Sequence, residues 1–175
     1  MNNSIHIISS LSPLLFIYGG LLYVLLTQNL FGIYFAINIF LFGNLVNQGI
    51  KYICKENLYY LEWMHRPNEY AKCGYYVDYN LPHDNGGINW GFPSGHMQTA
   101  LLASTLIIGY MYSINYENKE IYSGLLTSLC IYIGFSRYYL ECHNLVQILA
   151  GSFLGIIFGI ILIFIWIKFK KLYLH

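Results

Sequence analysis

A histidine and an arginine stand close together between two apolar runs in the last third of this sequence. Arg137 precedes His143 by six residues, and Gln147 follows His143 by four. Residues four apart share one face of a helix, so the Gln147 amide could orient the His143 imidazole. Polar groups at the edge of apolar segments are usually functional. We interpret residues 136–147 as half of an active site.

A second polar group follows a proline at the start of another apolar segment. Ser94, Gly95 and His96 stand directly after Pro93, and Ser94 is a suitable helix N-cap. The first backbone N–H groups of a helix have no partner within the helix and attract anions, and glycine permits a ligand to approach closely. We interpret this turn as the other half of the site.

The residue types in these two groups suit phosphate chemistry. Arginine presents a planar fork that matches phosphate oxygens, and lysine adds a point charge. Histidine serves either as a nucleophile that is phosphorylated transiently or as an acid that protonates the leaving group. A lone histidine more often only forms hydrogen bonds, but His96 and His143 accompany two arginines. We therefore expect a receptor for a multiply charged anion, with phosphate as the first candidate.

The composition indicates an integral membrane protein. Of the 175 residues, 57% are hydrophobic and only 10% are charged. Because backbone polar groups in lipid must be satisfied internally, we predict an all-α integral membrane helical bundle that forms one domain, residues 1–175. The net charge is only +1 and most basic residues are scattered, which argues against a nucleic-acid partner. No cofactor is expected.

About five apolar segments are candidates for transmembrane helices of this bundle. A path that alternates across the membrane brings the end of the second, the start of the third, the end of the fourth and the start of the fifth to one face. The unusual polar residues converge there. Residues 136–140 would lengthen the fourth segment, which is otherwise short. The five segments comprise residues 5–26, 30–53, 94–111, 121–135 and 145–167.

Three further features refine this picture. The first segment lacks the positively charged start of a secretory signal, so we expect it to be retained. Residues 56–93 form a polar loop with aromatic side chains that suit a membrane interface, and residues 58–64 could form one short turn in it. In the fifth segment a glycine recurs every fourth residue, a spacing that predicts close helix packing. These glycines are Gly151, Gly155 and Gly159.

The cysteines and the terminal lysines bear on the cellular compartment. No metal-ligand spacing is present, so the default role of the cysteines is small apolar filler, although Cys54, Cys73 and Cys142 would lie near one face, where a disulfide could form. A lysine cluster over residues 168–171 favours a cytoplasmic C-terminus, and chemistry accounts for the basic residues of the other face. We therefore expect the site on the lumenal or extracytoplasmic face.

These motifs resemble those of the type 2 phosphatidic acid phosphatases, which share their core with bacterial acid phosphatases and vanadium haloperoxidases. The run from Pro93 to His96 is similar to the second motif of that family, Pro-Ser-Gly-His. Ser136-Arg137, followed after five residues by His143, is similar to the third. The resemblance covers roughly residues 45–160.

The first motif of the family departs from its usual spacing in this chain. The pattern is a lysine, six residues and then Arg-Pro, and Arg66-Pro67 matches its end. No lysine stands seven residues before Arg66, so the motif must contain extra residues. We assign the lysine to Lys51, with Lys55 as the reserve.

The partner of the third-motif histidine is the second departure. The family usually has an aspartate four residues after this histidine, where this chain has Gln147. Losing the analogous carboxylate in serine proteases costs about 10⁴ in turnover, mainly through the wrong imidazole tautomer. Gln147 could accept the same hydrogen bond if other groups hold its amide in that orientation. The dolichyl diphosphate phosphatase branch resembles this chain, both here and in a glutamine placed like Gln98.

The resemblance implies a role for each matching residue. His143 would attack phosphorus, His96 would protonate the leaving group, and Gln147 would orient His143. Five other residues would bind the phosphoryl oxygens, and the positive charge of the lysine and the two arginines among them would make a metal unnecessary. They are Lys51, Arg66, Ser94, Gly95 and Arg137.

The leading hypothesis is a membrane enzyme that hydrolyses a lipid phosphate or diphosphate through a phosphohistidine, with polyprenyl (dolichyl-type) diphosphate as the first choice of substrate. One alternative is a phosphatase acting on phosphatidate or another lipid phosphate. A second is a phosphotransferase that uses an alcohol in place of water as the acceptor. The third is a membrane binding or transport protein that holds a lipid phosphate without cleaving it. The residues do not indicate an oligomeric state.

Overall fold

The described residues of this protein are almost all helical. Within them, one isolated antiparallel bridge joins His65 and Trp90, so the predicted all-α fold is confirmed for this part of the chain. Most of the first predicted segment and most of the predicted loop lie outside the described residues. The computed structural model describes residues 15–16, 18–20, 22, 29–58, 60–67, 73 and 90–173.

Five α-helices and two shorter helical elements carry bounds within this part of the chain. They are α2 (Leu30–Asn38), the π-helix η1 (Ile39–Leu45), α3 (Val46–Leu58), the 3-10 helix η2 (Glu62–Met64), α4 (Gly95–Ser113), α5 (Lys119–Tyr139) and α6 (Leu145–Tyr173). Elements α2, η1 and α3 follow one another directly, so the helical path continues from Leu30 to Leu58.

Four helices extend beyond the ends of the predicted apolar segments, and α4 does so by two residues, to Ser113. The second segment continues to Leu58, past the predicted residue 53, and the fifth continues to Tyr173, past residue 167. Residues 136–139 do continue the fourth segment, because α5 ends only at Tyr139. Lysine and glutamate are good helix formers, so the charged residues that mark an exit from lipid do not end the helix itself.

The π-helix η1 is tied to α4 through side chains of α4. Gln98 donates from Nε2 to the Phe42 carbonyl at 2.6 Å, and Thr99 donates from Oγ1 to the Gly43 carbonyl at 3.0 Å. Asn47 in turn donates from Nδ2 to Gln98 Oε1 at 2.8 Å. Gln98 is fully buried and has both ends of its amide paired. It therefore acts here as a polar link between helices.

Helices α4 and α6 cross closely along the predicted glycine row. A Cβ atom added at Gly151 would collide with the backbone carbonyl of Ser94. At Gly155 it would lie 2.5 Å from the Gln98 carbonyl, and at Gly159 it would lie 2.5 Å from the Thr105 side chain. The prediction that these glycines serve helix packing is confirmed. The row holds the start of α4 against the start of α6.

An aromatic cluster joins α2, α4 and α6 at the opposite end of the bundle. Phe31 stacks on Tyr110 with 3.8 Å between ring centroids, and Trp166 meets Phe31 edge-on at 5.3 Å. Asn29 caps α2, since its Oδ1 accepts from the Phe31 N–H at 2.8 Å, and its Nδ2 donates to Tyr110 Oη at 3.0 Å.

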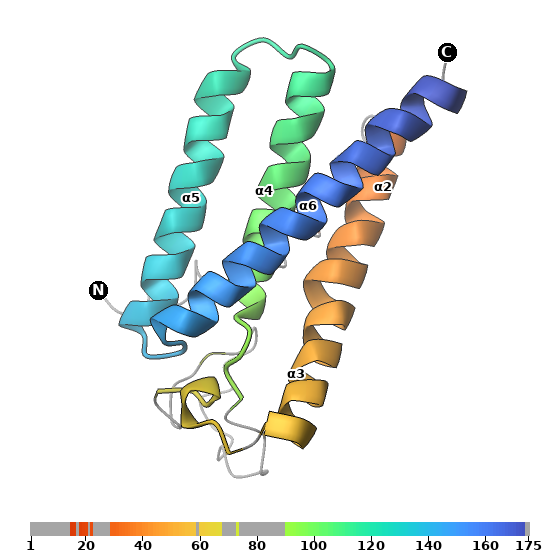
Figure 1. Cartoon of the computed structure of the whole chain (residues 1–175). Coiled ribbons are helices and arrows are strands. Elements are labelled where there is room, and N and C mark those ends of the chain that lie inside the picture. Colours follow the sequence, from red (N-terminus) through yellow and green to blue (C-terminus); the bar gives the residue numbers. More distant parts are fainter. Residues whose placement is uncertain are drawn as a thin grey trace.

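Two helical stretches of the described chain are long and apolar enough to cross a membrane, Leu30–Leu58 and Leu145–Tyr173. Helices α4 and α5 do not meet the same criterion. Five spans therefore stay a prediction. The ends that the alternating path predicts to meet do lie together: Figure 1 shows the end of α3, the start of α4, the end of α5 and the start of α6 at its lower side, with η2 beside them.

Candidate active site

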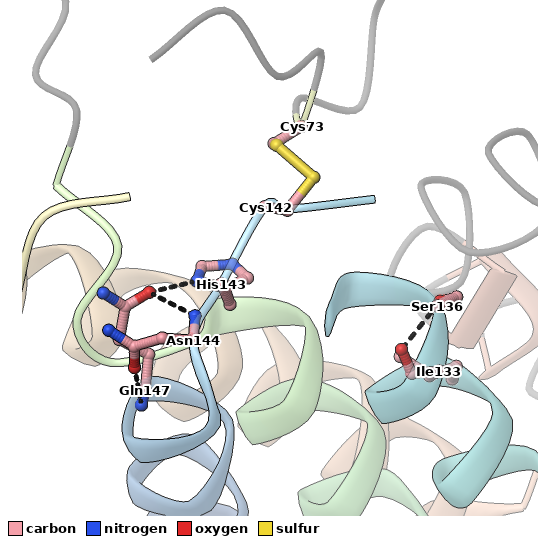
Figure 2. The surroundings of a disulfide bond; sticks show 7 residues. All are labelled: Cys73, Ile133, Ser136, Cys142, His143, Asn144 and Gln147. Atoms are coloured by element: carbon pink, nitrogen blue, oxygen red, sulfur yellow. Dashed lines mark hydrogen bonds between the residues drawn. A yellow bond between two sulfur atoms is a disulfide. The ribbon is translucent and has the colours of Figure 1, made fainter. Parts of the chain in front are cut away.

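The first turn of α6 is closed by a reciprocal cap between Asn144 and Gln147, and Gln147 also contacts His143, the nucleophile candidate. Asn144 Oδ1 accepts from the Gln147 N–H at 3.0 Å, while Gln147 Oε1 lies 3.4 Å from the Asn144 N–H. This is the arrangement of a capping box. The same Gln147 Oε1 lies 3.0 Å from Nδ1 of His143, and Figure 2 shows this contact. Both side chains are buried, with 2% of His143 and none of Gln147 exposed.

The amide of Gln147 can adopt only one orientation. Its Nε2 donates to the backbone carbonyl of Trp63 at 3.0 Å and to that of His65 at 2.6 Å. Carbonyls only accept, so the NH₂ group must face them and the oxygen must face His143. The His143 proton therefore lies on Nδ1, and Nε2 carries the lone pair. The condition that Gln147 must meet to replace an aspartate is fulfilled in this structure.

Residues 63–65 connect the segments that carry the three motifs. The Met64 carbonyl accepts from the N–H groups of Gly91 at 2.9 Å and Phe92 at 3.2 Å, just before the Pro-Ser-Gly-His turn. The Trp63 and His65 carbonyls accept from Gln147 of α6. Arg66 is the next residue in the sequence. Gly91 packs against the Gln147 carboxamide so closely that an added Cβ would overlap it.

The Pro-Ser-Gly-His turn precedes and begins α4, and the hydroxyl group of its serine forms no hydrogen bond. Ser94 occupies the predicted N-cap position, but its side chain does not cap the helix, and its buried Oγ has no hydrogen-bond partner. The Ser94 N–H donates to the backbone carbonyl of Gln147 at 3.0 Å, which connects this turn to α6. Gly95 and His96 form the first helical residues, and His96 is buried. The peptide bond before Pro93 is cis.

Three cations act on the buried imidazole. The pKa of His143 lies well below its ordinary value, mainly because burial disfavours the charged form. The positive charge of Arg66 adds most after burial, and Lys51 and Arg137 act in the same direction. The hydrogen bond to Gln147 opposes them. His143 is therefore neutral near pH 7 and has an unprotonated ring nitrogen.

The first-motif residues also lie at this site. Lys51 is on α3, and its charge acts on His143 together with that of Arg66, which favours Lys51 over Lys55 as the motif lysine. Burial lowers the pKa of Arg66, whose Nη1 is buried without a hydrogen-bond partner. A buried arginine donor and a buried serine hydroxyl without partners suit an anionic ligand with several acceptor oxygens.

Arg137 lies in the last turn of α5 and its side chain is fully buried. Its carbonyl accepts from the N–H groups of Cys142 at 3.0 Å and His143 at 3.2 Å, which fixes the connection between α5 and α6. Glu141 in this connection has a φ of 53°, in the left-handed region. The eight predicted site residues thus all fall at one end of the bundle.

A disulfide joins Cys73 to Cys142, the residue directly before His143, as Figure 2 shows. The default reading of these two cysteines as apolar filler is wrong. Cys54 and Cys130 are free, and buried Cys130 contacts the Ser104 hydroxyl at 3.2 Å. The described residues contain no group of three or more His, Cys, Asp or Glu side chains arranged to hold a metal ion.

Sequence reasoning missed the contributions of Asn144, Gly91 and the carbonyls of residues 63–65. An Asn followed by Gln at the third position matches a capping box, so the Asn144 cap had a readable signal. The backbone carbonyls had none, because every residue carries one.

Comparisons with known proteins find similarity over the part of the chain that contains these motifs. The sequence matches the PAP2 superfamily over residues 30–171, a range that includes all the candidate site residues. It is 35% identical over 80 residues to a protein of Saccharomyces cerevisiae (strain ATCC 204508 / S288c) named dolichyldiphosphatase. That alignment covers 43% of this chain and 34% of the yeast protein, so the chain matches about a third of the relative's length. No solved structure matches the chain.

Proposed function

Because this chain belongs to the PAP2 superfamily, we propose that it is a membrane phosphatase that removes the terminal phosphate from a polyprenyl diphosphate. The single observation that carries this proposal is the fixed orientation of Gln147, which leaves a neutral His143 with its lone pair on Nε2. A site that only bound phosphate would have no use for a nucleophile held in one tautomer. We treat residues 1–175 as one domain.

In the first chemical step, His143 Nε2 attacks the terminal phosphorus. The N–P bond forms as the bond from phosphorus to the bridging oxygen breaks, and His96 gives its proton to that oxygen. Lys51, Arg66 and Arg137 neutralise the charge on the transferring group, a stabilisation that is often the largest catalytic contribution. The products of this step are the polyprenyl monophosphate and a phosphohistidine.

In the second step, a water molecule attacks the phosphohistidine. His96, now neutral, takes a proton from the water as the new P–O bond forms and the N–P bond breaks. This restores the His143 lone pair and the protonated His96, and inorganic phosphate leaves. The Ser94 hydroxyl, the Arg66 guanidinium and the first N–H groups of α4 bind the phosphoryl oxygens in both steps. No step requires a metal ion.

The choice of a polyprenyl diphosphate rests on two observations. The relative from yeast is named dolichyldiphosphatase, and its match to this chain is partial. Gln147 takes the place usual for aspartate, a departure in which this chain resembles the dolichyl diphosphate phosphatase branch. An apolar tail would remain in the bilayer beside the apolar helices while the diphosphate occupies the polar end of the bundle.

We place the site on the lumenal or extracytoplasmic face of a membrane crossed about five times. Disulfides persist in oxidising compartments, and the Cys73–Cys142 disulfide is adjacent to His143. Lys170 and Lys171 end α6 at the opposite side of the bundle, where the positive-inside rule favours the cytoplasm. Two independent features therefore support the same orientation.

The test is phosphate release from polyprenyl diphosphate and from phosphatidate by the purified protein in detergent, with a chelator present. We expect release from the diphosphate, loss of activity in His143→Ala, and an acid-labile phosphohistidine in the wild type. His175→Ala is the matched control, since this histidine lies beyond the matched region. Equal activity in His143→Ala would refute the mechanism, and tight binding without release would favour the transport alternative.

A further inference from the structure

Asn144 forms one hydrogen bond more than a helix cap needs. Its Oδ1 caps α6 by accepting from the Gln147 N–H at 3.0 Å. Its Nδ2 donates to the Trp63 carbonyl at 2.7 Å, across 81 residues of sequence. Serine, threonine and aspartate cap helices through an oxygen alone, so the contact with Trp63 is a separate function of the asparagine amide.

We propose that Asn144 is a positioning residue, which fastens the segment of residues 63–66 to the first turn of α6 and so aligns Arg66 with His143. The inference rests on the proposed function, because it concerns the same phosphoryl site. Asn144 touches neither reacting atom in this mechanism. It acts through the backbone of Trp63, three residues before Arg66.

The segment that carries Arg66 has little structure of its own to hold it. Among described residues 60–67, regular structure is limited to the 3-10 helix η2 (Glu62–Met64) and the isolated bridge from His65 to Trp90. Its other backbone connections run outward, from the Met64 carbonyl to Gly91 and Phe92 and from the Trp63 and His65 carbonyls to α6. These tertiary hydrogen bonds therefore contribute to the distance between Arg66 and the nucleophile, together with the disulfide from Cys73, seven residues after Arg66, to Cys142.

The Nδ2 bond of Asn144 also protects the orientation of Gln147. The Trp63 carbonyl receives Asn144 Nδ2 and Gln147 Nε2 together, at 2.7 and 3.0 Å. If Asn144 releases this carbonyl, Trp63 can move away from Gln147 as well. Small displacements matter here, because a shift of about 1 Å in a catalytic geometry can cost about 10²-fold in rate.

The experiment compares Asn144→Ser with Asn144→Ala. A serine at this position can still accept the hydrogen bond from the Gln147 N–H that caps α6, but it cannot replace the Nδ2 bond to the Trp63 carbonyl. An alanine can form neither hydrogen bond. We expect kcat/KM for polyprenyl diphosphate to fall about tenfold in each variant, with extra loss of thermal stability only in alanine. We also expect the acid limb of kcat/KM to move to higher pH, because Arg66 would then lower the His143 pKa less.

The matched control is Asn29→Ser. Asn29 caps α2 through Oδ1 and donates through Nδ2 to Tyr110, so the substitution removes an equivalent contact at the far end of the bundle. We expect unchanged kcat/KM in this variant. Wild-type activity in Asn144→Ser, or a loss in Asn144→Ala alone, would show that only the cap matters and would overturn the proposal.

Binding of inorganic phosphate, measured as thermal stabilisation, separates this inference from the proposed function. We expect phosphate to bind about tenfold more weakly to Asn144→Ser than to the wild type. If the wild type binds phosphate but releases none from any lipid, the proposed function fails, and the ratio of the two affinities still decides the role of Asn144. Equal affinities, or no phosphate binding in either protein, would refute the positioning role.

Discussion

The two ends of the bundle use the same residue in different surroundings. Asn29 begins α2 at one end and Asn144 begins α6 at the other, and each caps its helix through Oδ1. The Asn29 amide then contacts a tyrosine side chain in an aromatic cluster, whereas the Asn144 amide contacts a backbone carbonyl in a polar network. Aromatic packing positions the first end, whereas the second combines close helix packing and a disulfide with a network of hydrogen bonds.

This difference has an energetic consequence. Apolar packing tolerates small rearrangements, because dispersion contacts are individually weak and numerous. A buried polar network loses much more when one member is removed, since the remaining groups are left unsatisfied in a medium of low dielectric constant. Substitutions at the aromatic end should therefore reduce stability, and substitutions at the polar end should reduce turnover.

The largest effect should follow Gln147→Leu. Leucine removes the acceptor for His143 Nδ1 and the donors to Trp63 and His65, so the imidazole loses its fixed tautomer. By analogy with an orienting carboxylate, we expect kcat to fall about 10³- to 10⁴-fold. Steady-state phosphate release measures this. A fall of less than tenfold would show that Gln147 does not orient the nucleophile.

The aromatic end is tested by Phe31→Ala. Phe31 is buried against Tyr110 and Trp166, and its truncation leaves a cavity, so we expect a loss of about 3 kcal/mol in the free energy of unfolding. We expect kcat/KM of the folded fraction to change less than twofold. Thermal unfolding in detergent measures the loss of stability, and activity at low temperature measures kcat/KM of the folded protein. A large loss of activity without loss of stability would contradict the division between the two ends.

Gly91→Ala should give the next effect. A Cβ at this position would overlap the Gln147 carboxamide, so the amide must shift from His143. We expect kcat to fall about 10²-fold, as for other displacements of about 1 Å. Gly49→Ala is the control, because an added Cβ there meets no atom within 4 Å. Wild-type activity in Gly91→Ala would mean that the Gln147 position is not required.

The smallest expected effect concerns pH. In the proposed mechanism His143 must be neutral to attack, and its folded pKa is well below the ordinary 6.5, so the acid limb of kcat/KM should lie below pH 6.5. In Arg66→Gln the limb should move to higher pH, since one positive charge is removed. The depressed pKa also means that the unfolded chain binds this proton more readily. Stability from His143 is thus complete above pH 6.5 and is lost as pH falls through the folded pKa.

Profiles of kcat/KM between pH 4 and 8 for both proteins test this prediction. An acid limb above pH 6.5 in the wild type would show that the His143 environment does not disfavour its charged form. An unchanged limb in Arg66→Gln would show that Arg66 lies too far from His143 to affect it.

Much of this protein could be predicted from its sequence. Apolar length indicates helices whatever their neighbours, which is why the helical segments were found while the ends at residues 58, 113 and 173 were not. The polar residues beside those segments were also visible, because charged and amide groups are rare in such runs. The glycine row predicted close packing of α6 against another helix, since only small side chains permit it, and the structure identifies that helix as α4.

The sequence by itself determined which residue types are available: two histidines, the cations and an amide near helix ends. Only the tertiary structure decided how they are arranged. The carbonyls of Trp63 and His65 orient Gln147, the fold pairs Cys73 with Cys142, and Lys51 lies where its charge reaches His143. The physical reason is that a backbone carbonyl is common to all residues. Which carbonyl faces a given side chain depends on the path of the whole chain.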